Sequence, residues 1–174
     1  MAGQTWFKAE LKKMKDFSVL EIGTRRWIPQ FPTHHKDWDW FTGYREFIMS
    51  DFMEGEDVDV VADVHELSKT FGENRFDVIF LPSVFEHLDR PWIAATEILK
   101  VLSPGGIFMV QTHQTFPIHG YPNDYFRYTT SGLLSLFAGA SEKYGNYEFP
   151  CEIHSEECGI QKNAFLNVVV AGRK

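Results

Sequence analysis

The sequence predicts a three-layer α/β fold in which a mostly parallel sheet carries helices on both faces. Short apolar runs alternate with amphipathic helical stretches, and several of the runs end at glycine, aspartate or proline. Strands that are buried on both faces have this nearly continuous apolar character, because helices cover both sides of a parallel sheet. A chain of 174 residues also suits one domain. We therefore expect residues 1–174 to form a single domain of this class.

The first half of the chain is expected to supply one helix and four strands. Apolar residues recur at helical spacing over residues 6–15, which predicts a helix there. Buried strands are expected at residues 18–23, 46–51, 58–63 and 76–81, since each is a short apolar run with a stop signal at or just after its end. Pro29 and Pro32 exclude a long helix from the link between the first two strands.

The second half begins with the most clearly marked helix. Asp89 is placed to cap it, Pro91 lies in its first turn, and an apolar face follows, formed by Trp92, Ala95, Ile98, Leu99 and Leu102. Residues 103–106 (SPGG) end this helix and lead into a strand at residues 107–112. A short helix at residues 131–137 and a last strand at residues 165–171 complete the predicted elements.

Charge and composition exclude several classes of function. A net charge of −7 argues against broad nucleic-acid binding, which needs a basic surface to displace counterions. No apolar run approaches the roughly eighteen residues of a membrane span, and no signal peptide is visible at the N-terminus. Cys151 and Cys158 are too few for a disulfide framework. We expect a cytoplasmic protein without nucleic-acid or membrane partners, and its oligomeric state stays open.

Polar and small residues stand where the predicted strands end. Gly23, Asp51, Asp63, Pro82 and Thr112 follow or close five successive strands. In open parallel sheets, ligands bind beyond the carboxyl ends of the strands, near the switch in strand order. A glycine leaves backbone amides bare for close approach, and an aspartate can accept two hydrogen bonds from a ribose diol or one from an amine. The ligand site is therefore expected at this edge.

The order of several motifs resembles the class I S-adenosylmethionine-dependent methyltransferases. These motifs are residues 19–23 (VLEIG), 58–65 (VDVVADVH), 76–80 (FDVIF), 85–91 (FEHLDRP) and 98–106 (ILKVLSPGG). The resemblance runs from about residue 18 to residue 130. It implies a Rossmann-like, seven-stranded sheet of order 3-2-1-4-5-7-6 with the seventh strand antiparallel. It also implies S-adenosylmethionine as cofactor and a small-molecule acceptor, with oxygen as the expected acceptor atom.

Carried over residue by residue, the resemblance implies a cofactor site at the strand ends. Glu21 and Gly23 would border the methionine part of the cofactor, and Asp51 would hold the ribose hydroxyls. The acid near the adenine amine would be Asp63, followed by Val64 as a further cofactor contact. Alternatively, Asp51 and Asp63 only bond loop amides, as aspartates at strand ends commonly do.

The resemblance implies three further positions that contact the methyl donor. Thr24 and Arg25 follow Gly23 where the family usually continues Gly-x-Gly-x-Gly, and this turn is similar to the Gly-Ser-Arg turn of some members. Ser83, just past the fourth strand, lies where the family's cofactor and acceptor meet. The same missing glycines count against a nicotinamide dehydrogenase. They also leave an alternative open, a methyltransferase-like cofactor-binding or partner module without turnover.

The segment at residues 119–129 (HGYPNDYFRYT) resembles one found in small-molecule members of the family. His119 and His113 are the candidate catalytic residues, since a histidine can take the proton of a hydroxyl acceptor. The candidate acceptor contacts lie in the same segment and are Tyr121, Asp124, Tyr125 and Arg127. For the histidines the alternative is a bond to a backbone carbonyl, and for Asp124 and Arg127 it is a local ion pair that shapes the loop.

Aromatic residues, 16% of the chain, gather in two stretches that lie mostly outside the predicted strands of the core. One covers residues 27–52 and the other residues 116–128. Trp27, Trp38, Trp40 and Phe41 either cover the sheet as an ordinary apolar layer or wall an acceptor pocket. We expect both functions to be shared among them, with residues 27–44 and 116–128 overhanging the cofactor.

No metal site is expected from the sequence. Cys151, His154 and Cys158 have a spacing that suggests zinc, but a structural zinc site needs four ligands and no second pair lies nearby in the sequence. His87 is assigned a structural hydrogen bond, because it directly precedes the start of a helix.

Overall fold

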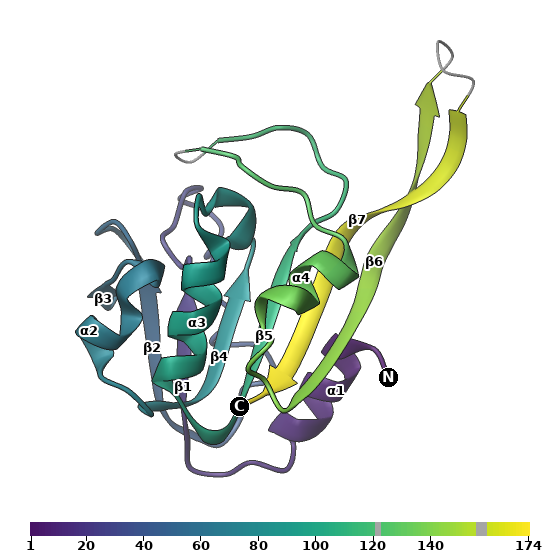
Figure 1. The fold of residues 1–174 in the computed structure, drawn as a ribbon. Helices are drawn as coiled ribbons and strands as arrows, with labels where there is room; N and C mark the ends of the chain where they lie inside the picture. Colours follow the sequence, from purple (N-terminus) through teal and green to yellow (C-terminus); the bar gives the residue numbers. More distant parts are fainter. Residues whose placement is uncertain (121–122, 156–159) are drawn as a thin grey trace.

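The structure, a computed structural model, describes residues 1–120, 123–155 and 160–174. Its centre is a seven-stranded sheet in the order β3-β2-β1-β4-β5-β7-β6, which confirms the order expected above (Figure 1). In chain order the strands are β1 (Phe17–Ile22), β2 (Tyr44–Asp51), β3 (Val60–Val61), β4 (Phe76–Pro82), β5 (Leu102–His113), β6 (Glu142–Ser155) and β7 (Ile160–Arg173).

The sheet is mixed rather than purely parallel. β1 pairs in parallel with β2 and β4, β2 pairs in parallel with β3, and β4 with β5. β7, the strand next to β5, runs antiparallel to both β5 and β6, so the reversed seventh strand agrees with the expectation. Because β1 to β5 run in one direction, their carboxyl ends meet at one edge of the sheet.

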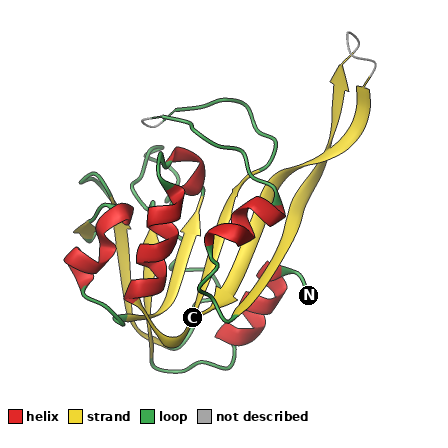
Figure 2. Cartoon of the chain, viewed as in Figure 1, coloured by secondary structure: helices red, strands yellow, loops and turns green. Residues whose placement is uncertain are grey.

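Helices cover both faces of the sheet. α2 (Leu67–Phe71), α3 (Pro91–Val101) and α4 (Thr130–Leu136) pack on one face and lie in front of the sheet in Figure 2. α1 (Gly3–Leu11) packs on the opposite face. Successive strand residues alternate between the two cores, as Val19 and Leu20 do, because neighbouring side chains in a strand point to opposite sides. Among the residues described here, no helix is both long and apolar enough to cross a membrane.

Strand β6 is the element that residue patterns alone do not predict. It begins with Glu142 and Lys143, and it pairs only with β7 at the edge of the sheet. An edge strand with polar side chains lacks the apolar run by which buried strands are recognised. Its place is decided by pairing with β7, whose apolar residues the sequence does reveal.

Two expected boundaries are wrong in ways that affect the site. β3 contains only Val60 and Val61, so Asp63 lies beyond the strand, where its side chain caps the short 3-10 helix η1 (Val64–Glu66). The N-cap of α3 is Arg90 and not Asp89, and it makes no side-chain cap hydrogen bond. Pro91 at the first helical position starts this helix without such a cap.

Two long links extend past the carboxyl ends of the strands. Residues 23–43 connect β1 to β2, and residues 114–129 connect β5 to α4. The second link, which we call the β5–α4 loop, arches above the strand ends in Figure 1. Phe41 and Trp40 of the first link pack into the core on the α1 side, so part of that link completes the layer that α1 begins.

Candidate functional site

A pocket of about 520 Å³ opens at the carboxyl ends of the parallel strands. Its wall comes from the ends of β1 and β2, from residues 62–65, 82–84 and 87–90, and from His119, Asn123 and Tyr125 of the β5–α4 loop. Another hollow, of about 440 Å³, lies at the opposite end of β4 beside Asn74 and Lys174 and contains none of the predicted site residues. The strand-end pocket is therefore the candidate site.

Gly23 forms the turn by which the chain leaves β1 at the edge of the pocket. Its φ is +89°, and its amide donates to the carbonyl of Ser50 at 2.8 Å. A Cβ at this position would lie 2.5 Å from Cγ2 of Val84, which is far inside van der Waals contact. The position therefore excludes side chains both by its backbone conformation and by its space, although the further glycines usual in the family's motif are absent.

Replacing Gly23 with alanine is expected to destabilise the protein by about 2–4 kcal/mol. A left-handed backbone costs an L-residue roughly 1–2 kcal/mol, and the overlap with Val84 adds a similar amount. Gly43→Ala is the matched control, because Gly43 also has a positive φ, +80°, but an added Cβ there meets nothing within 4 Å. Chemical denaturation should show the smaller loss for Gly43→Ala. Equal losses would mean that contact with Val84 does not matter.

Asp51 presents a buried carboxylate at the end of β2, with 6% of the residue exposed. Its Oδ2 accepts a hydrogen bond from the amide of Arg25 at 3.3 Å, and its Oδ1 accepts one from the amide of Met53 at 3.1 Å. These two bonds hold the carboxylate in one orientation at the pocket wall. Each oxygen keeps a further lone pair with which it can accept a hydroxyl of a ligand.

Asp63 also lines the pocket, and His65 folds back onto it. Oδ1 of Asp63 accepts from the backbone amide of His65 at 2.9 Å, and Nδ1 of the same histidine lies 2.7 Å away. Burial raises the pKa of the Asp63 carboxyl. The hydrogen bonds and charge of His65, together with the charge of Arg90, lower this pKa by more than burial raises it. The pKa thus lies below its usual value, and the group is an ionised acceptor at neutral pH.

The β5–α4 loop is fixed by an ion pair between Asp124 and Arg127. Nη2 of Arg127 lies 2.6 Å from Oδ2 of Asp124, and the guanidinium also donates to the carbonyls of Phe116 and Pro117. Asp124 in turn accepts the amide of His119 at 2.8 Å. The Arg127 guanidinium holds the pKa of the Asp124 carboxyl far below its usual range. This pair therefore shapes the segment that carries His119.

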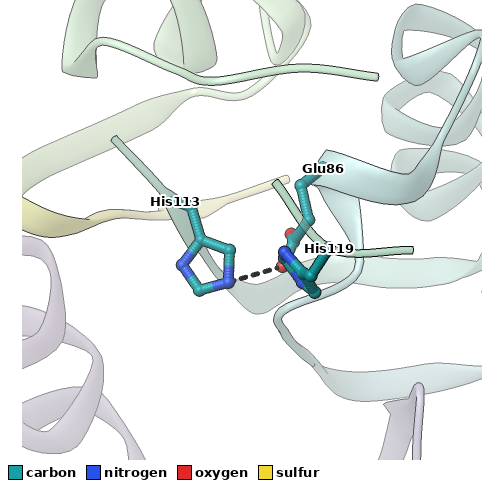
Figure 3. A group of neighbouring side chains, drawn as sticks. All are labelled: Glu86, His113 and His119. Carbon is teal, nitrogen blue, oxygen red and sulfur yellow. Dashed lines mark ion pairs between the residues drawn. The ribbon is translucent and has the colours of Figure 1, made fainter. Parts of the chain in front are cut away.

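Beneath the loop, a buried carboxylate faces His113. Glu86, in the short helix η2 (Phe85–His87), has no exposed surface, and its Oε1 lies 3.0 Å from Nε2 of His113 (Figure 3). Oε2 of Glu86 accepts from Oγ1 of Thr112 at 2.6 Å. Burial raises the pKa of Glu86, but contacts with His113 and Thr112 together lower it by more, so the pKa lies below its usual value. Burial lowers the pKa of His113, but Glu86 raises it by more, so the pKa lies above its usual value.

Comparisons with known proteins agree with this arrangement. Residues 47–110 match the family model of a methyltransferase domain. A methyltransferase from Archaeoglobus fulgidus that depends on S-adenosylmethionine superposes with a TM-score of 0.65 at 15% identity, over 99% of this chain and 95% of that one. The matched segment is that of a methyltransferase domain, and the chain has the fold of S-adenosylmethionine-dependent methyltransferases. The expected enzyme class and cofactor are thereby confirmed.

Two further solved structures share the fold of this methyltransferase. One is the 1,6-didemethyltoxoflavin-N1-methyltransferase of Burkholderia thailandensis, with 1,6-didemethyltoxoflavin and S-adenosylhomocysteine bound. It has a TM-score of 0.62 at 19% identity, over 97% of this chain and 76% of that one. The other, an S-adenosylmethionine-dependent methyltransferase from Mesorhizobium loti, has a TM-score of 0.58 at 14% identity, over 98% and 96%. No curated protein matches the chain significantly.

Most of the cofactor residues expected from the sequence meet in the methyltransferase pocket, and three do not. Gly23, Asp51, Asp63, Val64 and Ser83 line it. Glu21, Thr24 and Arg25 are not among the described residues of its wall.

These three side chains instead hold the surrounding chain in place. Glu21 is buried and accepts the amide and ring nitrogen of His35, because it projects from β1 toward the α1 face. Thr24 is buried and donates to the carbonyl of Asp57 at 2.7 Å. Arg25 lies over the ring of Trp27, 4.2 Å from its centroid.

Of the residues predicted to act on or contact the acceptor, some line the pocket and others do not. His119 and Tyr125 line the pocket, whereas His113 is buried beside Glu86 and is not part of the described wall. Asp124 and Arg127 pair with one another, which agrees with the alternative that they shape the loop. Tyr121 lies outside the described residues, as do the side chains of His154 and Cys158, and Cys151 is a free, half-buried cysteine.

The aromatic residues of the first link divide as expected between core and pocket. Trp40 and Phe41 pack with Phe80 in the core on the α1 side, and Trp38 packs on Trp40. Trp27 lines the pocket.

Sequence reasoning missed several residues of the pocket wall. Phe52 is 48% exposed there and directly follows Asp51, so its place after a strand-end acid was a usable signal. Asp89 was assigned to a helix cap and Arg90 to no site, and both residues line the pocket. Glu86 is one of several polar residues in the motif at residues 85–91. No local pattern reveals that it is buried, because its partners Thr112 and His113 come from β5.

Proposed function

We propose that this domain transfers the methyl group of S-adenosylmethionine to an oxygen atom of a small-molecule acceptor. The observation that carries the proposal is the single pocket in which Gly23, Asp51 and Asp63 face His119 and Tyr125 of the β5–α4 loop. Methyl transfer from a sulfonium is an in-line displacement, so most of its catalysis consists of placing donor and acceptor together. One pocket with a cofactor end and a loop-covered end suits that task.

At the cofactor end, each contact follows from the chemistry of the wall. The oriented carboxylate of Asp51 would accept the two ribose hydroxyls. Asp63, with Val64 beside it, would receive the adenine amine, and the exposed ring of Phe52 offers an apolar face to the base. Gly23, which lines the pocket at the end of β1, would border the methionine part of the cofactor.

At the acceptor end, His119 is the residue that we assign to the acceptor hydroxyl. Its Nδ1 lies 3.2 Å from the carbonyl of Pro117 and 3.3 Å from Oδ2 of Asp124. A histidine whose Nδ1 is oriented in this way can receive a proton at Nε2. Ser83 and Tyr125 line the pocket with it, and they are the expected contacts to the acceptor.

Calorimetric titration with S-adenosylhomocysteine tests the cofactor end, and labelled S-adenosylmethionine with a panel of phenols and other hydroxyl compounds tests transfer. We expect saturable binding and incorporation of label into at least one hydroxyl acceptor. Absence of binding up to about 1 mM, an affinity worth only about 4 kcal/mol, would contradict the proposal. Binding without transfer to any acceptor would favour the alternative, a cofactor-binding module without turnover.

A further inference from the structure

We propose that Glu86, His113 and His119 form a binding site for a divalent transition-metal ion such as Zn²⁺, next to the acceptor end of the pocket. One ligand atom from each residue lies within 4.8 Å of the other two (Figure 3). The three come from η2, β5 and the β5–α4 loop, which the fold brings together. Within the described part of the chain, no other three histidine, cysteine or acidic residues form such a group.

Two of the ligands are oriented by partners at their other polar atoms. Glu86 uses Oε2 to accept from Thr112 at 2.6 Å, which leaves Oε1 for an ion. His113 has its Nδ1 3.0 Å from Oδ1 of Asn167, so the Nδ1 proton is donated there, and a metal ion at Nε2 would displace the proton that this nitrogen shares with Glu86. That Nε2 is the atom that faces Oε1 of Glu86 at 3.0 Å.

His119 has the same kind of support. Its Nδ1 lies near the carbonyl of Pro117 and near Oδ2 of Asp124, at 3.2 and 3.3 Å, which leaves Nε2 as the free ring nitrogen. Histidines that bind metals almost always donate their other ring N–H to a carbonyl or carboxylate, which sets the tautomer and the ring orientation. Both histidines of this group are held in that way.

An independent observation is the state of the Glu86 carboxylate. Glu86 is fully buried, yet its Oε1 has no hydrogen-bond partner of acceptable geometry among the described residues. The nearby His113 nitrogen balances charge when it is protonated, but it does not direct a hydrogen bond at this oxygen. Oε1 is therefore held by an ion pair and by no directed bond, and a cation between Glu86 and the histidines would supply that bond.

The distances also fit an ion after a small adjustment. Ligand atoms at roughly 2.1 Å from a tetrahedral zinc ion are separated by about 3.4 Å. The Glu86–His113 contact of 3.0 Å needs to open only slightly. His119 is the ligand with freedom to close in, because its side chain is 31% exposed and belongs to a loop. Two histidines and one carboxylate suit Zn²⁺ and other late divalent metals.

Three protein ligands leave a coordination position open toward the pocket, through the only ligand of the three that lines it, His119. A hydroxyl bound at such a position would lose its proton more readily, and that proton would pass to solvent water in the pocket. This last step rests on the proposed function, and in it the ion takes over from His119 the task of promoting deprotonation. The metal site itself does not depend on methyl transfer.

The test uses protein without a histidine tag, stripped with a chelator and titrated with ZnCl₂ by calorimetry and with CoCl₂ by visible absorption. We expect one ion per chain and the intense bands of low-coordinate Co²⁺. Glu86→Gln, His113→Gln and His119→Ala should each weaken binding at least about 100-fold, since each removes a direct ligand. His35→Gln is the matched control, because His35 also contacts a buried glutamate, Glu21 at 2.6 Å, outside the group.

Two results would overturn the metal site. One is wild-type affinity for Zn²⁺ and Co²⁺ no tighter than about 1 mM, and the other is unchanged affinity in His119→Ala, whose exposed position makes it the variant least prone to misfold. Binding of S-adenosylhomocysteine is measured on the same samples. Cofactor binding without metal binding would remove this inference alone, whereas metal binding without cofactor binding would leave the site and remove the proposed function.

Discussion

Replacing Asp51 with alanine is expected to weaken binding of S-adenosylhomocysteine at least about 30-fold. Under the proposed function, its carboxylate accepts two ribose hydroxyls, and a hydrogen bond to a charged group contributes roughly 1.5–3 kcal/mol. The side chain is almost completely buried and held by the amides of Arg25 and Met53. No other carboxylate of the described wall has this place at the end of β2. Calorimetric titration measures the loss directly.

The control must separate lost ligand contacts from lost structure, because Asp51→Ala also frees two backbone amides. Asp59→Ala matches it: Oδ2 of Asp59 accepts the amide of Met49 at 2.8 Å, in the same part of the sheet but outside the pocket wall. We expect Asp59→Ala to lower the melting temperature while leaving cofactor affinity within about threefold of wild type. If both variants lose affinity equally, Asp51 acts through structure and not through the ribose.

Replacing Arg127 with leucine is expected to abolish methyl transfer while leaving cofactor affinity nearly unchanged. Arg127 neutralises the buried Asp124 carboxylate and also donates to the carbonyls of Phe116 and Pro117. Without it, Asp124 retains a buried charge with no cation, so the β5–α4 loop must open to hydrate that charge. Amide hydrogen exchange across residues 114–129 should accelerate at least about tenfold, and this readout needs no knowledge of the acceptor.

Lys100→Met provides the matched control for Arg127→Leu. Lys100 pairs with Glu97 at 2.6 Å with the same spacing of three residues, and the Glu97 side chain is only 7% exposed. This pair lies on α3, outside the described wall of the pocket. We expect a comparable loss of stability, unchanged exchange in residues 114–129 and unchanged transfer. Unchanged exchange in Arg127→Leu would show that the loop is held by other contacts.

The strand-end half of the pocket was largely predictable from the chain. A buried parallel strand is recognised in the sequence by its apolar run. The residue that follows the run lies at the carboxyl edge of the sheet, whichever strands are its neighbours. That is why Gly23, Asp51 and Ser83 were found. Glu21 shows the limit: it lies within the strand, and the alternation of side chains turns it to the opposite face.

The loop-covered half was predictable only as a segment. Residues 119–129 were recognised, but which of their side chains face the pocket depends on how the loop folds on itself. The pairing of Asp124 with Arg127 turns these two inward to one another and presents His119 and Tyr125. From the sequence alone, Asp124 and Arg127 could equally well pair with each other or contact a ligand.

The sequence by itself determined the α/β class, the strand ends and the methyltransferase resemblance, because these depend on local patterns and on their order. Only the tertiary structure decided that residues 142–155 form β6, that Asp63 caps η1, and that Glu86, His113 and His119 meet. The last grouping joins three elements that are distant in sequence. Its geometry follows from the parallel pairing of β4 with β5 and from the loop that folds back over them, which no local pattern encodes.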